Sequence, residues 1–186
     1  MFQKLLSKIA ARLDKSGIPY MVIGGQAVLL YGEPRLTKDI DITLGVGVED
    51  LKKVLRAVAG MKLKVLVDHV EDFVKKTMVL PAADSSGLKV DFVFSFSPYE
   101  RQAISRAVRV RLGKSRVKFA SREDVIIHKI IAGRARDLED VRSIILKNPG
   151  YDKRYVRKWL KEFDESLGED FFRSFQKING KSKRRI

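Results

Sequence analysis

Hydrophobic positions along the first 120 residues follow two different periods. Apolar residues recur at helical spacing over 2–16 and 48–59, which predicts two amphipathic helices. A short helix is expected at 26–32, directly after the pair Gly24–Gly25. Runs rich in alternating or β-branched residues predict strands at 18–23, 39–46, 62–67, 73–80 and 88–96, and a hairpin of 108–112 with 116–120.

The pattern changes to helical spacing alone from Ser121 onward. Ser121 is a typical N-cap residue with Asp124 three positions later, and helices are predicted at 123–133, 136–148, 153–167 and 169–178. The sequence therefore predicts an α/β (α+β) fold. A mixed β-sheet with flanking helices is expected over 1–120, a C-terminal helical bundle over 121–180, and a basic tail over 181–186.

Composition narrows the chemistry. The 186 residues are 45% hydrophobic and 33% charged, which is typical of a globular chain, and they include no Cys and two His. The lack of Cys excludes disulfides, thiolate zinc sites and cysteine nucleophiles. No apolar run approaches the roughly 18–20 residues of a membrane span, so we expect a cytoplasmic protein with no membrane partner.

Positive charge is concentrated in the second half of the chain. The net charge is +15; residues 1–100 hold 14 Lys and Arg against 12 Asp and Glu, whereas residues 101–186 hold 24 against 11. This asymmetry favours a polyanionic partner such as RNA. A lysine-rich surface that serves only solubility is the alternative.

Three aspartates carry the candidate chemistry. Asp39 and Asp41 are two residues apart on a predicted strand, so both side chains point to one face. Asp91 interrupts the hydrophobic strand LKVDFVF and joins them if the two strands pair. Clustered carboxylates without His or Cys favour Mg²⁺ or Mn²⁺, and three can bind two such ions for phosphoryl transfer. A solvated acidic strand edge is the alternative.

These residues resemble a known signature. Ile23-Gly24-Gly25, Asp39-Ile40-Asp41-Ile42 and Val90-Asp91-Phe92 match the pattern of the DNA polymerase β-like nucleotidyltransferase superfamily. The wider segment GGQAVLLYGEPRLTKDID is similar to the AbiEii-like, abortive-infection type nucleotidyltransferases. The positions that carry this closer resemblance are Ala27, Tyr31-Gly32, Arg35 and Thr37.

A second block resembles later motifs of the same family. Lys129 and the helix Arg136-Asp137-Leu138-Glu139-Asp140 match a helix lysine followed by Arg-Asp-x-x-Asp. The resemblance implies that Lys129 contacts nucleotide phosphates and that Arg136, Asp137 and Asp140 shape the site. The residues alone allow a simpler interpretation, in which Lys129 is a surface lysine and the two acids stabilise a helix start.

The expected function is metal-dependent transfer of NMP from an NTP to a hydroxyl acceptor. Asp39, Asp41 and Asp91 would hold two Mg²⁺ or Mn²⁺ ions, with Asp91 also acting as general base. The resemblance implies nucleotide binding, for example of ATP, by Gly24, Gly25, Arg35, Thr37 and Lys129. It also raises a toxin–antitoxin role with a cognate antitoxin as partner. The acceptor is expected to be RNA, such as a tRNA end, or a protein.

Alternatives of other classes stay open on the sequence alone. A catalytically inert nucleotide- or nucleic-acid-binding module of the same fold is one, and a drug-modifying nucleotidyltransferase is another. Tyr155 and Trp159 lie among Arg154, Arg157, Lys158 and Lys161 on one predicted helix. These two aromatics either stack on RNA bases or form the buried face of that helix, which we expect more.

Overall fold

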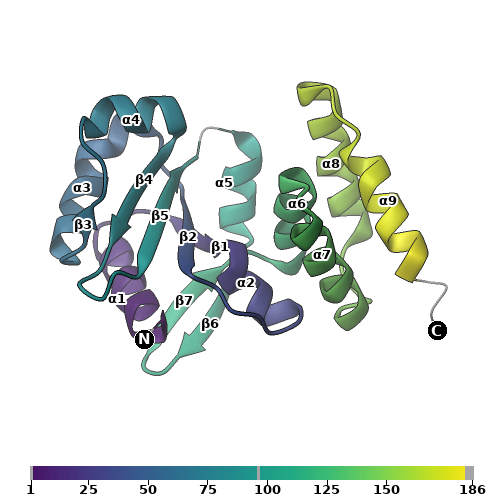
Figure 1. Ribbon diagram of the computed structural model, residues 1–186, viewed down its shortest axis with the longest axis horizontal. Helices are drawn as coiled ribbons and strands as arrows, with labels where there is room; N and C mark the ends of the chain where they lie inside the picture. The colour runs from purple at the N-terminus through teal and green to yellow at the C-terminus, as the bar shows by residue number, and fades with distance from the viewer. Residues whose placement is uncertain (1, 96, 183–186) are drawn as a thin grey trace. The chain divides into compact units, whose positions relative to one another are not determined.

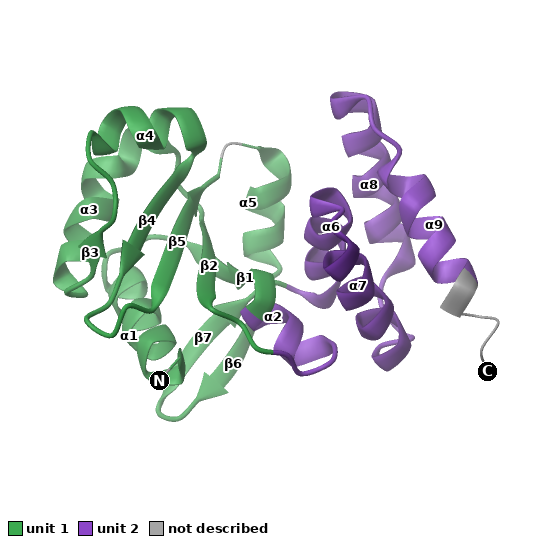
Figure 2. Cartoon of the chain, viewed as in Figure 1, with its two compact units in different colours: residues 1–25, 36–120 green, residues 26–35, 121–186 purple. Residues whose placement is uncertain are grey.

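A computed structural model describes residues 2–95 and 97–182 of the chain (Figure 1). Phe96, at the end of the predicted strand 88–96, lies outside the described residues, as do Met1 and residues 183–186 of the predicted basic tail. The chain divides into two compact units (Figure 2). The first holds the residues up to Gly25 together with Leu36–Ala120, and the second holds Gln26–Arg35 together with the chain from Ser121 onward.

The first unit is built on a mixed sheet. Its seven described strands follow the order β3-β4-β5-β2-β1-β7-β6. They are β1 (Tyr20–Ile23), β2 (Asp39–Leu44), β3 (Lys64–Val65), β4 (Val79–Ala83), β5 (Lys89–Phe94), β6 (Val108–Leu112) and β7 (Ser115–Phe119). The pairs β2–β5 and β1–β7 are parallel and the other neighbours are antiparallel. The mixed α/β fold that the sequence predicts is confirmed.

Helices pack against this sheet on an apolar core. They are α1 (Phe2–Lys15), the 3-10 turn η1 (Val48–Asp50), α3 (Leu51–Gly60), α4 (Val70–Thr77) and α5 (Pro98–Ser105). Helix α1 contacts β7 and α3, and α4 contacts β4. Ile40 and Ile42 of β2 and Phe92 and Phe94 of β5 are fully buried on one face of the sheet. The alternate positions point to the other face, where Asp39 is exposed and Asp41 and Asp91 are half-buried.

Two elements correct the sequence prediction. The predicted strand 73–80 is wrong, because Val70–Thr77 form α4 and β4 begins only at Val79. Acidic residues in the first turn and lysines in the last turn match the helix dipole and favour the helix. Helix α5 had no counterpart in the prediction, although Ser97, Pro98 and Glu100 form a capping box that marks its start.

Helix α2 (Gly24–Tyr31) begins in the first unit and continues into the second. The second unit otherwise consists of α6 (Arg122–Ala132), α7 (Ala135–Lys147), α8 (Lys153–Leu167) and α9 (Phe171–Ser182). Helix α6 contacts the other three, and α9 also packs against α7 and α8. The Ser121 side chain accepts the Asp124 N–H, which confirms the predicted N-cap. The helices within the described ranges are all too short or too polar to span a lipid bilayer.

The aromatic residues of α8 belong to the core of the helical unit. Tyr155 and Trp159 are each 8% exposed, and the Tyr155 hydroxyl donates to Asp124 Oδ1 over 2.8 Å. These two side chains therefore form the buried face of α8, and stacking of RNA bases on them is excluded in this conformation. The basic side chains of α8 that the sequence singles out are exposed, namely Arg154, Arg157, Lys158 and Lys161.

Candidate active site

Strand pairing brings the three sequence-predicted aspartates onto one surface of the first unit. In the parallel pair of β2 and β5, Asp41 lies directly beside Asp91. Asp39 lies two residues before Asp41 on the same face of β2. The two strands do pair, so the condition under which Asp91 joins the other two aspartates is met. The intervening residues Ile40 and Val90 are buried, which fixes the register.

The surroundings of these carboxylates are only partly hydrated. Asp39 is exposed, whereas Asp41 and Asp91 are half-buried. Burial raises the pKa of Asp91, and the negative charge of Asp39 raises that pKa further, while Lys89 lowers it. Like charges beside one another in a partly desolvated place disfavour ionisation, so the site favours an added cation.

Lys89 is a site residue to which the sequence analysis assigned no role. It is the in-register partner of Asp39 and lies on the same face of β5 as Asp91, two residues away. The alternation of buried and exposed positions along β5, which placed Asp91 on this face, could also have placed Lys89 there. A positive charge at this position partly compensates the acids from the edge of the cluster.

Gly24 shapes the other side of Asp41. Strand β1 ends at Ile23, which pairs with Asp41, and the chain then turns into α2 at Gly24. The φ angle of Gly24 is +64°, which favours glycine, and a Cβ at this position would come within 1.9 Å of Asp41 Oδ2. The carboxylate of Asp41 thus occupies the space beside the bare backbone where α2 begins.

The donor set fits a hard divalent cation. Three carboxylates on one surface, one with a pKa raised by burial and by a neighbouring acid, match the oxygen ligands that Mg²⁺ and Mn²⁺ prefer. Across residues 2–95 and 97–182, the present side-chain conformations hold no group of three or more His, Asp or Glu gathered for metal binding. The fit therefore rests on the backbone register of Asp39, Asp41 and Asp91.

A second cluster of predicted site residues lies within the helical unit. Lys129 Nζ lies 2.6 Å from Asp137 Oδ1 and 3.1 Å from Asp140 Oδ2. Arg35 binds Asp140 with two parallel hydrogen bonds of 3.1 Å, from Nε and Nη2. Arg134 Nε donates to Asp137 over 2.5 Å. Together these residues form a continuous ionic network, which we call the Lys129 network.

The Lys129 network is largely buried. Lys129 is 5% exposed, so it is neither the surface lysine of the simpler interpretation nor an ammonium with free access to solvent. Burial raises the pKa of Asp137, but the hydrogen bonds from Arg134 and Lys129 outweigh it and hold that pKa below its usual value. Buried charges are tolerated only when paired, and here each acid has two basic partners.

Two predicted site residues, Arg136 and Thr37, belong to neither the aspartate cluster nor the Lys129 network. Arg136 is exposed at the start of α7 and forms no ion pair with any residue that the structure describes. Thr37 is half-buried in the segment that leads into β2. The structure thus brings Gly24, Asp39, Asp41 and Asp91 together in the first unit and Arg35, Lys129, Asp137 and Asp140 together in the second. The roles assigned to these residues stay predictions.

Comparison with known families and structures gives one family and one fold. A family model described as "Nucleotidyl transferase AbiEii toxin, Type IV TA system" matches residues 10–182. No sequence match is found among curated proteins.

Three solved structures illustrate the shared fold. The antibiotic-resistance factor ANT(2'')-Ia in complex with adenylyl-2''-tobramycin has 18% sequence identity and a TM-score of 0.61, over 89% of this chain and 98% of that chain. An antigenic nucleotidyltransferase-like protein from Paracoccidioides brasiliensis has 18% identity and a TM-score of 0.56, over 88% and 87%. The lincomycin-bound lincosamide antibiotic adenylyltransferase LnuA has 16% identity and a TM-score of 0.53, over 76% and 94%. At these identities, the likeness shows the fold alone.

Proposed function

The chain belongs to the AbiEii nucleotidyltransferase family, and we propose that it transfers NMP from an NTP to a hydroxyl acceptor at Asp39, Asp41 and Asp91. The observation that carries this proposal is the register of β2 and β5, which sets Asp41 beside Asp91 with Asp39 on the same face. An inert binding module would gain nothing from three mutually repelling carboxylates, so turnover is favoured over the inert alternative.

Asp39, Asp41 and Asp91 would hold two divalent ions, Mg²⁺ or Mn²⁺. When bound, these ions supply charge neutralisation to the triphosphate and to the oxygens that attack and leave. The protein's own contribution is position: β2 and β5 fix the spacing of the ligands, and Gly24 leaves room for the carboxylate of Asp41. In phosphoryl transfer, positioning and electrostatic stabilisation supply most of the rate.

The start of α2 would bind the triphosphate. Gly24 and Gly25 open this helix, whose first N–H groups have no partner within the helix and carry positive dipole. Arg35, Thr37 and Lys129 stay the further nucleotide-binding residues that the resemblance to the family implies. Because Lys129 is already bound by Asp137 and Asp140, a phosphate would have to compete with both carboxylates. We therefore propose that Asp137 and Asp140, with exposed Arg136 next to Asp137 in the sequence, shape the surroundings of Lys129.

The transfer step needs one base. The acceptor hydroxyl oxygen attacks the α-phosphorus, the bond from that phosphorus to the bridging oxygen of the β-phosphate breaks, and pyrophosphate leaves. The hydroxyl proton passes to Asp91, whose raised pKa makes it a stronger base than an ordinary exposed carboxylate. In this proposal, residues 1–120 carry the chemistry of the transfer step.

Exposed cations support RNA as the acceptor. In the hairpin of β6 and β7, Arg109 lies opposite Lys118 and Arg111 opposite Arg116. Like charges directly across a hairpin repel, and Arg109, Arg111 and Arg116 have no carboxylate partner among the described residues. A phosphate backbone would relieve this repulsion. The exposed basic residues of α8 add to the positive surface of the helical unit.

Drug modification is the weaker alternative. The structure of ANT(2'')-Ia holds adenylyl-2''-tobramycin and that of LnuA holds lincomycin, but the likeness of these proteins to this chain extends to the fold only. A cationic aminoglycoside would meet a protein with a net charge of +15. The toxin–antitoxin context comes from the family description, and we propose a cognate antitoxin as partner on that ground.

The test is label transfer. The protein is incubated with each α-labelled NTP, Mg²⁺ and total RNA or cell lysate, and the labelled product identifies the base and the acceptor. We expect Asp41→Asn to abolish transfer without unfolding the chain, while the same change at exposed Asp68 leaves it intact. Equal labelling by the wild type and the Asp41→Asn variant would overturn the assignment.

A further inference from the structure

Strand β6 is an open edge of the sheet. It lies at one end of the strand order and pairs with β7 alone, so its other side has no neighbouring strand among the described residues (Figure 1). The edge strand at the other end of the sheet, β3, spans two residues, whereas β6 spans five, from Val108 to Leu112. An edge strand presents unpaired backbone N–H and C=O groups to another extended chain, and a longer edge presents more of them.

The turn of the β6–β7 hairpin determines which backbone groups face the open side. Gly113 and Lys114 form a two-residue turn in which Gly113 has a φ of +61° and Lys114 has no positive φ, the pattern of a type II′ turn. The residues that flank such a turn exchange hydrogen bonds, and every second pair along the ladder does the same. The bonded pairs are therefore Leu112 with Ser115, Val110 with Val117 and Val108 with Phe119.

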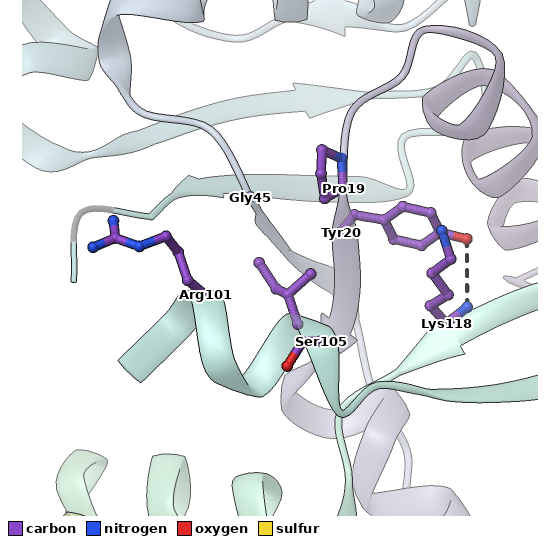
Figure 3. A pocket seen from close by; sticks show the side chains of 7 residues that line it. Pro19, Tyr20, Gly45, Arg101, Ser105 and Lys118 are labelled. Carbon is purple, nitrogen blue, oxygen red and sulfur yellow. Dashed lines mark hydrogen bonds between the residues drawn. The ribbon is translucent and has the colours of Figure 1, made fainter. Parts of the chain in front are cut away.

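Arg109 and Arg111 consequently direct their backbone N–H and C=O groups away from β7. Their partners across the hairpin are Lys118 and Arg116, whose N–H groups point away from β6 in turn. The Lys118 N–H indeed donates to the Tyr20 hydroxyl of β1 over 3.4 Å (Figure 3). Arg109 and Arg111 are exposed, and their N–H groups find no backbone acceptor in the part of the chain that the structure describes.

One face of β6 carries cations without acidic partners. Arg109 and Arg111 are two residues apart and so lie on the same face, with Arg116 of β7 beside Arg111. Arg111 Nε donates to the carbonyl oxygen of Gly113 over 3.1 Å, and none of the three guanidinium groups pairs with a carboxylate of the described residues. Pairing of β6 with a second copy of itself would set like charges against one another, whereas acidic side chains on an added strand would compensate them.

The other face of β6 carries an apolar row. Val108 is 45% exposed, and Val110 and Leu112 are half-buried. Apolar side chains at alternate positions of an added strand would lie beside these residues and remove more of their surface from water. The phosphates of RNA can bind the arginine side chains, but RNA has neither the alternating N–H and C=O groups that match the edge nor side chains that cover the apolar row.

We propose that β6 binds an extended acidic segment of a partner protein as an added strand, with acidic side chains beside Arg109 and Arg111 and apolar side chains beside Val108 and Val110. In this mode of recognition, backbone hydrogen bonds supply affinity and the alternating side chains supply specificity. The same arginines belong to the surface proposed for RNA, so the added strand and RNA would exclude each other. Binding of the strand does not depend on transfer activity.

The test uses a capped peptide of alternating glutamate and valine, as long as β6 with one further residue at each end. A copy in which every backbone nitrogen is methylated keeps the charge but donates no backbone hydrogen bond, and it should bind at least about tenfold more weakly. Amide hydrogen exchange of the full chain is followed by ¹H–¹⁵N NMR. We expect saturating peptide to slow the exchange of the Arg109 and Arg111 N–H groups at least about tenfold, whereas the Val110 N–H is already protected in the free protein by its pairing with Val117.

Two comparisons of variants separate charge from the backbone edge. Arg109→Gln with Arg111→Gln should weaken peptide binding about tenfold, while Lys52→Gln with Lys75→Gln removes the same charge from exposed sites outside the hairpin and should change it by less than about twofold. Arg109→Pro removes the same charge as Arg109→Gln and also the outward N–H, but it leaves the hydrogen bonds to β7 intact. It should therefore bind the peptide about fivefold more weakly than Arg109→Gln.

The proposal is overturned if the peptide does not bind, if its methylated copy binds equally well, or if saturating peptide leaves the exchange of the Arg109 and Arg111 N–H groups unchanged. Equal affinity of Arg109→Gln and Arg109→Pro for the peptide would also overturn it. Two further results would give the edge to another occupant. Total tRNA that slows the same N–H groups as strongly as the peptide would assign the edge to RNA, and slowing by higher protein concentration alone would assign it to a second copy of the chain.

Discussion

Gly24 and Asp41 lie so close together that no side chain fits between them. A Cβ at position 24 would approach Asp41 Oδ2 to 1.9 Å, and the φ of +64° at Gly24 independently favours glycine. The turn from β1 into α2 therefore determines where the carboxylate of Asp41 can lie. The position of the proposed metal ligand Asp41 therefore depends directly on the proposed phosphate-binding turn at Gly24.

Gly24→Ala should displace the Asp41 carboxylate and so lower the rate of NMP transfer. The new methyl group displaces the carboxylate of Asp41, and displacements of about 1 Å can cost on the order of 10²-fold in turnover. Gly17 provides the control, because its φ is +59° but nothing lies within 4 Å of a Cβ there. Both variants should lose about 1–3 kcal/mol of stability from strain, but only Gly24→Ala should lose label transfer. Full transfer by Gly24→Ala would contradict the role of this contact.

Breaking the Lys129 network should strongly lower the free energy of unfolding of the helical unit. Removing Lys129 by Lys129→Met leaves Asp137 and Asp140 buried with one basic partner each, which should cost about 3–5 kcal/mol. Trp159 is the single tryptophan of the chain and is buried in this unit, so its fluorescence in urea reports the unfolding. Breaking the exposed pair of Lys158 and Glu162 by Glu162→Gln should cost less than about 1 kcal/mol. Similar losses in both variants would show that burial adds nothing to the network.

Acid should weaken the same unit through Asp137. The pKa of Asp137 is held below its usual 3.8, so its contribution to stability is fully present above that value. It is lost as the pH falls through the lowered pKa, because the folded state must then bind a proton that the unfolded state already holds. Urea unfolding followed by Trp159 between pH 5 and 3 should therefore show a smaller decline in Asp137→Asn than in the wild type. Asp68→Asn, which changes an exposed acid, should keep the wild-type decline.

RNA binding should depend steeply on salt. Removing one phosphate-binding cation lowers the slope of log affinity against log salt by about 0.7 for single strands, so Arg109→Gln with Arg111→Gln should lower it by about 1.4. Lys52→Gln with Lys75→Gln removes the same charge from exposed sites outside the hairpin and should change the slope less. Filter binding of total tRNA across salt concentrations measures these slopes. A flat response in the wild type would argue for a protein or a small-molecule acceptor.

The sequence predicted the aspartate cluster because its cause is local. Alternation with period two sets Asp39 and Asp41 on one face, and the buried Ile40 and Val90 beside them fix the register with Asp91. The Lys129 network was beyond such reasoning. Arg35 and Asp140 are 105 positions apart, and nothing in the helical pattern around Lys129 indicates that buried carboxylates bind it.

The misassigned elements had signals of a different kind. For α4, the charges at its two ends favoured a helix, while the run of β-branched and apolar residues at its C-terminal side favoured a strand. The capping box of Ser97 and Glu100 indicated the start of α5 in four residues, but a hydrophobic pattern too short to show a period followed it. The charges at the ends of α4 and the capping box of α5 were better guides than periodicity.

Residues 26–35 lie in the helical unit, although both flanking stretches lie in the first unit, so the chain passes from one unit to the other three times. A single genetic crossover after Ala120 would consequently separate Arg35 from Asp140, its bidentate partner. Exchange of the helical unit by recombination requires two segments to move in one event. The helical unit must therefore be inherited together with residues 26–35. We expect this unit to diverge between relatives by substitution and not by exchange of a whole module.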